Sequence, residues 1–195
     1  MIGGLLSSED VVEEVMRDEL FYEVSGGGAT LTGGEPLAQP EFCAEILSLL
    51  RERKIHTAIE TSLQCPRSAV EAVQGLADLF LVDMKLADSA RHAAATGSGN
   101  DLIRENFRLL ASGGAKILVR VPLIPGFTAD AENLRDIGAF VRQTRPDIPI
   151  ECINFNPLAR DKYALLDKSW PFDPTLGRYS EDDMKAFNEL TGDRS

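Results

Sequence analysis

Residues 26–36 read GGGATLTGGEP, a short apolar segment enclosed by glycines. Ala29 to Thr32 predict a β-strand, and the strand stops at a glycine loop that starts at Gly33. Pro40 suits the first position of a helix, and apolar residues at helical spacing follow it as far as Arg53. The stretch therefore predicts a strand, a glycine loop and a helix in that order.

The same alternation of strand and helix continues along the chain. Apolar strands that are each followed by a helix indicate parallel pairing, with helices covering the sheet. The fold class is therefore α/β, either a doubly wound sheet or a partial barrel. No linker divides the chain, so we predict a single domain over residues 1–195, with an ordered loop over 155–178. The further predicted strands are 57–61, 79–85, 117–121 and 150–154, and the predicted helices are 8–20, 40–53, 68–74, 101–111, 130–143 and 180–190.

Composition excludes several classes of function. The 195 residues carry 20 Lys and Arg against 31 Asp and Glu, and the formal net charge of −11 disfavours binding to a phosphate backbone. No apolar run is long enough to span a bilayer, and the first residues lack the features of a signal peptide. We expect a soluble, cytoplasmic protein that binds neither nucleic acid nor membrane.

Polar residues interrupt the predicted strands at their last positions, where ligands of parallel α/β proteins bind. Side chains alternate along a strand, so Asp83 and Lys85 are expected to share a face. Each charge alone could belong to a structural ion pair. Burying unpaired charges costs several kcal/mol, however, so their repetition predicts one pocket for a small zwitterionic or cationic ligand. The residues are Gly33, Gly34, Glu35, Glu60, Thr61, Asp83, Lys85, Arg120, Asn154 and Asn156.

The loop Gly33 to Pro36 lets the backbone approach a ligand, and its carbonyl groups would suit an ammonium group. A tight turn without a ligand is the alternative. The loop matches neither a phosphate-binding loop nor a dinucleotide fingerprint. His56 opens a strand and His92 is expected in a surface helix or loop, so we assign no catalytic residue. Cys43, Cys65 and Cys152 are widely spaced and predict buried thiols rather than a metal site.

Several segments together resemble the activating enzymes of glycyl-radical enzymes, of the pyruvate formate-lyase activating enzyme type. These are radical S-adenosylmethionine proteins. The matching segments cover nearly the whole chain in order. They are 26–37, 39–42, 55–61, 81–85, 119–126, 155–159 and the pair Lys162 and Tyr163.

The resemblance implies a partial parallel (β/α) barrel of about five strands with flanking helices, and a site for S-adenosylmethionine. Gly33 to Pro36 would hold the methionyl ammonium. Asp83 and Lys85 would serve the carboxylate and nearby polar contacts, and Glu60 and Thr61 the ribose side. Arg120 and residues 153–156 would surround the adenosine. The family often has a histidine at the position of Asn156, so the sequence departs from the family there.

The resemblance also implies a [4Fe-4S] cluster, which reduces the sulfonium and produces a 5′-deoxyadenosyl radical. This radical takes a hydrogen atom from a glycine of the partner glycyl-radical enzyme, and the electron comes from a donor such as flavodoxin or ferredoxin. The cluster needs three thiolates at the spacing Cys-x-x-x-Cys-x-x-Cys, and this sequence has none. The sequence therefore resembles the family without its N-terminal cluster-binding part, and we expect the chain alone to be inactive.

Two other functions remain open on the sequence. The first is a noncatalytic module that keeps the fold and docks a partner protein. An open sheet edge could also mediate dimerisation in such a protein. The second is a hydrolase or aldolase in which Lys85 acts as an amine nucleophile.

Overall fold

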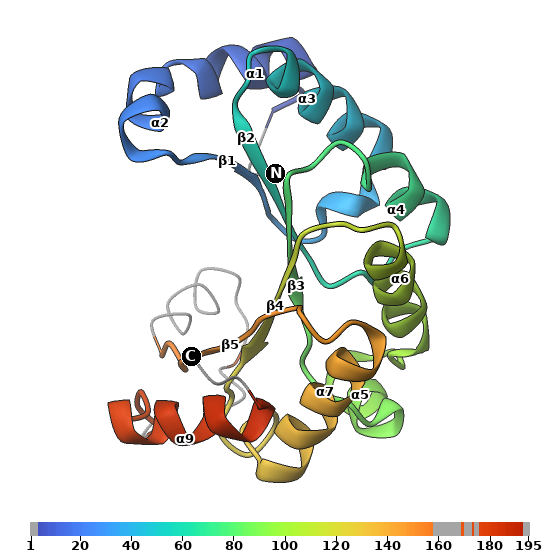
Figure 1. The fold of residues 1–195 in the computed structure, drawn as a ribbon, viewed down its shortest axis with the longest axis vertical. Helices are drawn as coiled ribbons and strands as arrows, with labels where there is room; N and C mark the ends of the chain where they lie inside the picture. The colour runs from blue at the N-terminus through green and yellow to red at the C-terminus, as the bar shows by residue number, and fades with distance from the viewer. Residues whose placement is uncertain (1–3, 158–168, 170–172, 174–175, 193–195) are drawn as a thin grey trace. The chain divides into compact units, whose positions relative to one another are not determined.

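The computed structural model describes residues 4–157, 169, 173 and 176–192. Its five strands follow one another in the sheet in chain order, β1-β2-β3-β4-β5, and helices flank them (Figure 1). The pairs β1/β2, β2/β3 and β4/β5 are parallel. The α/β class with about five strands is confirmed. The strands are β1 Gly28–Leu31, β2 His56–Thr61, β3 Leu79–Asp83, β4 Ile117–Pro122 and β5 Ile150–Ile153.

The chain forms two compact units, and the prediction of a single domain stays a prediction. The first unit comprises Met1–Asp83 and Asn100–Leu118. In it Thr57, Ala58, Ile59 and Thr61 of β2 are buried, as expected for a strand covered on both faces. Its helices are α1 Ser8–Met16, α2 Glu19–Ser25, η1 Pro36–Ala38, α3 Pro40–Glu52, α4 Arg67–Val73 and α6 Asp101–Ser112.

The second unit comprises Met84–Gly99 and Val119–Ser195. Val119 and Val121 of β4 are fully buried, whereas Arg120 between them is half-buried. The carboxyl end of β4 pairs with β5, with Val121 opposite Cys152. The helices of this unit are α5 Ser89–Thr96, α7 Ala131–Thr144 and α9 Glu181–Thr191.

The first helix is shorter than the predicted range 8–20. A capping box at Ser7 and Asp10 starts α1, and Val12 packs with Ile46, Leu50 and Ile55 in a buried cluster. The helix ends at Met16, where its apolar stripe ends, rather than near Leu20. A separate helix, α2, follows and has no buried residue.

Two further predictions need correction. The third strand ends at Asp83, so Lys85 lies two residues beyond it, and the alternation expected of one continuous strand does not apply to this pair. His92 is not on the surface: it is 5% exposed in α5, a helix that the sequence pattern left undecided. Its Nδ1 lies 2.7 Å from the carbonyl oxygen of Ser98, which explains how a polar ring is accommodated there.

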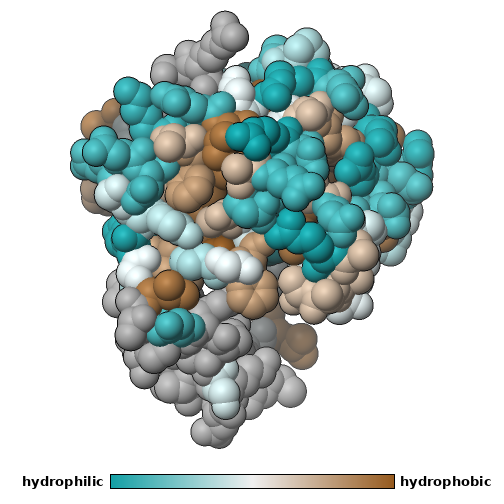
Figure 2. All heavy atoms as spheres, turned by 90° about the horizontal axis from the view of Figure 1, so that it is seen from below, coloured by the Kyte–Doolittle hydropathy of each residue, from teal (hydrophilic) through white to brown (hydrophobic). Residues whose placement is uncertain are grey.

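On the face seen in Figure 2, hydrophilic residues predominate among those described, in keeping with the net charge of −11. Within the described part of the chain, no helix has the length and apolar character needed to cross a membrane.

Candidate ligand site at the strand ends

The glycine loop that follows β1 leaves open space at its backbone. Gly33 has φ +147°, a conformation that side chains rarely adopt. A Cβ atom added at Gly34 would meet no atom within 4 Å, and no positive φ demands glycine there. Packing within the chain therefore gives no reason for Gly34 to lack a side chain. The open space fits a ligand that approaches the backbone closely.

Glu35 fastens this loop to the end of β2. Its carboxylate accepts hydrogen bonds from the backbone N–H of Leu37 (3.2 Å) and the hydroxyl of Thr61 (2.7 Å). It also accepts from the backbone N–H (2.9 Å) and hydroxyl (2.7 Å) of Ser62. These donors belong to the protein itself, so the negative charge is already stabilised without a ligand. Glu35 thus brings the Gly33–Pro36 loop and Thr61 together.

The turn after β2 is strained and is held by a residue that the sequence analysis missed. Leu63 has φ +60°, which is unfavourable for a residue with a side chain. The buried amide of Asn106, on α6, donates to the carbonyl oxygens of Leu63 (3.0 Å) and Cys65 (2.9 Å). The sequence signal that could have identified Asn106 is its place as a polar residue on the apolar face of α6.

Two predicted carboxylates of the first unit lie at strand ends. Glu60 and Asp83 are half-buried, at the ends of β2 and β3. In the parallel register of these strands, Glu60 lies opposite Leu81, one position along from Ile59 and Phe80. Both carboxylates therefore occupy the strand-end positions that the sequence analysis assigned to them.

The second unit contains the remaining residues that were predicted to contact the ligand. Lys85 and Arg120 are half-buried, directly after β3 and within β4. Asn133, on α7, donates to the carbonyl oxygen of Lys85 at 3.0 Å. The amide of Asn154 both donates to and accepts from the backbone of Tyr179, each at 2.9 Å, so it holds the segment before α9. Asn156 is exposed. Convergence of all the predicted residues on one ligand stays a prediction.

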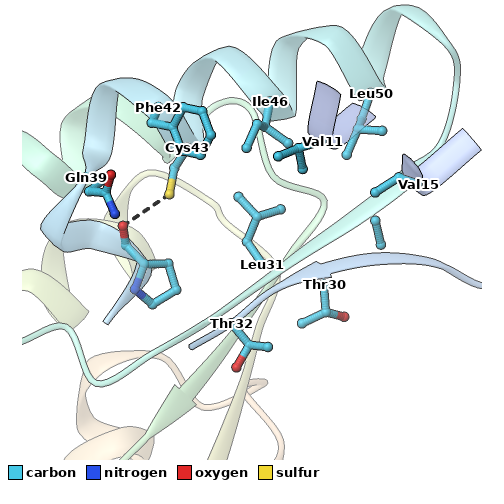
Figure 3. A pocket seen from close by; sticks show the side chains of 12 residues that line it. Val11, Val15, Thr30, Leu31, Thr32, Gln39, Phe42, Cys43, Ile46 and Leu50 are labelled. Carbon is cyan, nitrogen blue, oxygen red and sulfur yellow. Dashed lines mark hydrogen bonds between the residues drawn. The ribbon is translucent and has the colours of Figure 1, made fainter. Parts of the chain in front are cut away.

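An apolar groove of about 320 Å³ is lined by residues of α1, β1 and α3 (Figure 3). Val11, Leu31 and Ile46 line it, and the thiol of Cys43 donates to the carbonyl oxygen of Pro36 at 3.1 Å beside it. Pro36 alone of the predicted ligand residues lines the groove. The sequence analysis did not anticipate it.

The three cysteines do not fit an iron–sulfur cluster. All three are buried: Cys43 on α3, Cys65 after β2 and Cys152 on β5. Burial, and next the charge of Glu35, raise the pKa of the Cys43 thiol and raise the pKa of Cys65 to about 11. These thiols therefore stay protonated near neutral pH, whereas a cluster binds thiolates. Among the described residues, no group of three or more Cys, His, Asp or Glu side chains could hold a metal ion.

Part of the resemblance lies outside the described residues. Leu158, Ala159, Lys162 and Tyr163 belong to that part, as does most of the predicted loop over 155–178. The final helix is confirmed, as α9.

The chain matches a family model and several known proteins. The family model described as "Radical SAM superfamily" matches residues 3–137. The trans-4-hydroxy-L-proline dehydratase activating enzyme of Clostridioides difficile is 36% identical over 97% of this chain and 63% of its own length. The pyruvate formate-lyase 2-activating enzyme of Escherichia coli is 37% identical over 87% of this chain and 58% of its own.

A solved structure of a domain of pyruvate-formate lyase-activating enzyme from Bacteroides vulgatus also resembles the chain. It is 28% identical, with a TM-score of 0.67, and the match covers 85% of this chain and 93% of that one. Streptococcus suis SuiB, at 17% identity and a TM-score of 0.72, shares the fold. The chain spans only about three fifths of the length of these two curated relatives, 63% and 58%.

Proposed function

Since the chain belongs to the radical SAM superfamily, we propose that it is the S-adenosylmethionine-binding portion of a glycyl-radical enzyme activating enzyme. Support comes from relatives that are named as activating enzymes and are 36% and 37% identical. The partner would be a glycyl-radical enzyme, and the electron donor a flavodoxin or ferredoxin, within the cytoplasm.

The glycine loop is the observation that carries this proposal. Gly34 has no packing neighbour that would exclude a side chain, and Gly33 needs the conformational freedom of glycine. Glu35 anchors the loop through four hydrogen bonds from Leu37, Thr61 and Ser62. Glu35 therefore fixes one end of the loop, and the carbonyl oxygens of Gly33 and Gly34 suit the methionyl ammonium group.

The remaining predicted ligand residues keep the assignments that the resemblance implies. Glu60 and Thr61 serve the ribose side, and Asp83 and Lys85 the methionyl carboxylate and nearby polar groups. Arg120 and Asn156 are assigned to the adenosine. Glu35 and Asn154 already bond to their own chain, so we assign both to holding backbone in place.

The cluster ligands are proposed to come from a segment that is not among these 195 residues. Cys43, Cys65 and Cys152 are buried and do not form the required group of thiolates. We therefore expect this chain alone to show no iron–sulfur absorbance and no reductive cleavage of S-adenosylmethionine. Both should appear only when a segment with Cys-x-x-x-Cys-x-x-Cys is supplied.

A Gly34→Ala variant tests the ligand assignment by titration calorimetry. Its Cβ enters open space, so stability should be unchanged, whereas the affinity for S-adenosylmethionine should fall roughly tenfold or more as the methyl group blocks the amino-acid end. Binding of 5′-methylthioadenosine, which lacks that end, should not change.

Gly75→Ala is the matched control, because its Cβ also meets no atom within 4 Å and it lies away from the strand ends. Equal affinity of the Gly34→Ala variant and the unchanged chain would contradict the assignment. If the unchanged chain itself gives no heat at millimolar S-adenosylmethionine, the noncatalytic docking module becomes the better proposal.

A further inference from the structure

Two buried asparagines on different helices share a sequence pattern. Residues 105–108 read ENFR and residues 132–135 read ENLR. The asparagines are Asn106 on α6 and Asn133 on α7, and their exposed fractions are 1% and 2%. Asparagine is expensive to bury, so two buried asparagines in a repeated pattern need a physical reason.

Asn106 fixes the turn after β2. Its Nδ2 donates to the carbonyl oxygens of Leu63 and Cys65, which lie on either side of Gln64. Leu63 is fully buried and has a left-handed backbone conformation, which persists only when its surroundings hold it there. Asn106 therefore supplies part of the restraint that keeps this turn strained.

The hydrogen bonds continue from this turn to the glycine loop. The N–H of Leu63 donates to the hydroxyl oxygen of Thr61 at 2.9 Å. That hydroxyl in turn donates to Glu35, and the N–H of Ser62 donates to the same carboxylate. A change at Asn106 can therefore reach Glu35 through an unbroken series of hydrogen bonds within the first unit.

Asn133 performs the corresponding task in the second unit. Its Nδ2 donates to the carbonyl oxygens of Lys85 (3.0 Å) and Thr128 (2.9 Å). Its Oδ1 accepts from the N–H of Ala87 at 2.8 Å. The amide thus holds the backbone on both sides of Leu86, directly after β3.

We propose that Asn106 and Asn133 are positioning residues, which hold the backbone after β2 and after β3 in the conformation that binds ligand. This inference rests on the proposed binding of S-adenosylmethionine, because it assigns the two asparagines to the loops that carry Thr61 and Lys85. Neither asparagine needs to touch the ligand. Each raises the fraction of molecules whose loop is already competent to bind.

The first test measures the affinity for S-adenosylmethionine by calorimetry on the full chain with Asn106→Ala or Asn133→Ala. If the competent loop conformation falls to about a tenth of the molecules, the affinity falls about tenfold. Leu110→Ala on α6 and Ile137→Ala on α7 are the controls. Both remove buried apolar side chains from the same helices, so they lower stability while leaving the affinity unchanged.

Asn106→Asp and Asn133→Asp separate hydrogen-bond donation from the filling of space. Aspartate has nearly the size of asparagine, but its carboxylate cannot donate to the loop carbonyl groups. We expect both Asp variants to bind as weakly as the Ala variants at neutral pH. Wild-type affinity in the Ala or Asp variants would overturn the proposal.

Amide hydrogen exchange supplies a readout that needs no ligand. Exchange at Leu63 and Ser62 should accelerate in the Asn106 variants, and exchange at Ala87 in the Asn133 variants. The amide of Val119, which donates to the carbonyl of Pro149, should not respond in either. Unchanged exchange at the loop amides would overturn the positioning role. Failure of the unchanged chain to bind S-adenosylmethionine would instead refute the proposed function and leave exchange to decide the positioning role.

Discussion

The turn after β2 and the backbone after β3 are both held by a buried asparagine, but the two asparagines make different bonds. Asn106 donates to two carbonyl groups of a turn in which Leu63 is strained. Asn133 donates to two carbonyl groups and also accepts from the N–H of Ala87. The first loop has a second anchor in the charged Glu35, which bonds Thr61 and Ser62.

This difference shows that two loops of one protein can be held by different combinations of side chains. The turn after β2 has an amide on one side and a carboxylate on the other, so loss of one leaves the other in place. Asn133 bonds the backbone of both Lys85 and Ala87. The side chain of Asn133 makes three hydrogen bonds with backbone groups and that of Asn106 makes two, so the loss of Asn133 should have the larger effect.

The largest expected effect is therefore on stability. Asn133→Ala leaves one N–H and two carbonyl groups without their partner and should lower the free energy of unfolding by about 3 kcal/mol. Asn106→Ala leaves two carbonyl groups and lets Leu63 relax, so its loss should be smaller, about 2 kcal/mol. Urea denaturation of the full chain measures both values.

Exposed positions on the same helices provide the controls. Glu105→Ala on α6 and Gln143→Ala on α7 should each change the free energy of unfolding by less than about 0.5 kcal/mol. A greater loss for Asn106→Ala than for Asn133→Ala would contradict the proposed difference between the loops.

A smaller effect is expected on cysteine reactivity. Burial, and next the charge of Glu35, raise the pKa of Cys65 to about 11, so alkylation at pH 8 should be slow in the folded chain. Asn106 donates to the carbonyl oxygen of Cys65. The Asn106→Ala variant should therefore open this turn more often and react faster with iodoacetamide at Cys65.

Cys152 provides the internal comparison, because it is equally buried but lies on β5, where its N–H donates to Asn188. Mass spectrometry of the alkylated peptides distinguishes the two sites. Equal acceleration at Cys65 and Cys152 would indicate global unfolding instead of local opening of the turn.

The smallest expected effect on stability comes from the residues that cap the N-termini of α6 and α7. Asp130 caps α7, whereas Asn100 makes no side-chain capping bond at the start of α6. Burial raises the pKa of Asp130, but the hydrogen bond and charge of Arg91, together with the backbone N–H of Asn133, bring it below its usual 3.8. A lowered pKa stabilises the fold above pH 3.8, and this contribution is lost as the pH falls through the folded-state pKa.

Arg91 and Asp130 are 2.6 Å apart but substantially exposed, so Arg91→Ala should cost only about 0.5 kcal/mol at pH 7. The difference from the unchanged chain should shrink below pH 3.8 in acid denaturation. A difference that stayed constant into strong acid would show that the ion pair is not its origin.

Local patterns were sufficient for much of the fold. Apolar runs predicted the five strands, and the spacing after Pro40 predicted α3 to within one residue. Local patterns gave a wrong helix boundary where the apolar periodicity was weak. The segment Glu19–Ser25 forms a helix with no buried residue, so it offers no stripe to recognise, and α1 was extended into it.

The candidate site was predicted in part. The glycine loop, Thr61 and Lys85 were singled out because they interrupt strand ends. The anchoring role of Glu35 was not predicted, because some of its four hydrogen bonds come from Thr61 and Ser62, which lie 26 and 27 positions further along the chain. Asn106 and Asn133 were missed since each contacts a loop more than 40 positions earlier in the chain.

The sequence alone determined that this is a parallel α/β protein with polar strand ends, because alternation and apolarity act over a few neighbouring residues. It also determined, by its motifs, the superfamily. Only the tertiary structure decided which polar groups are already occupied by the chain's own hydrogen bonds. That distinction depends on contacts between distant segments, and no local pattern of residues encodes it.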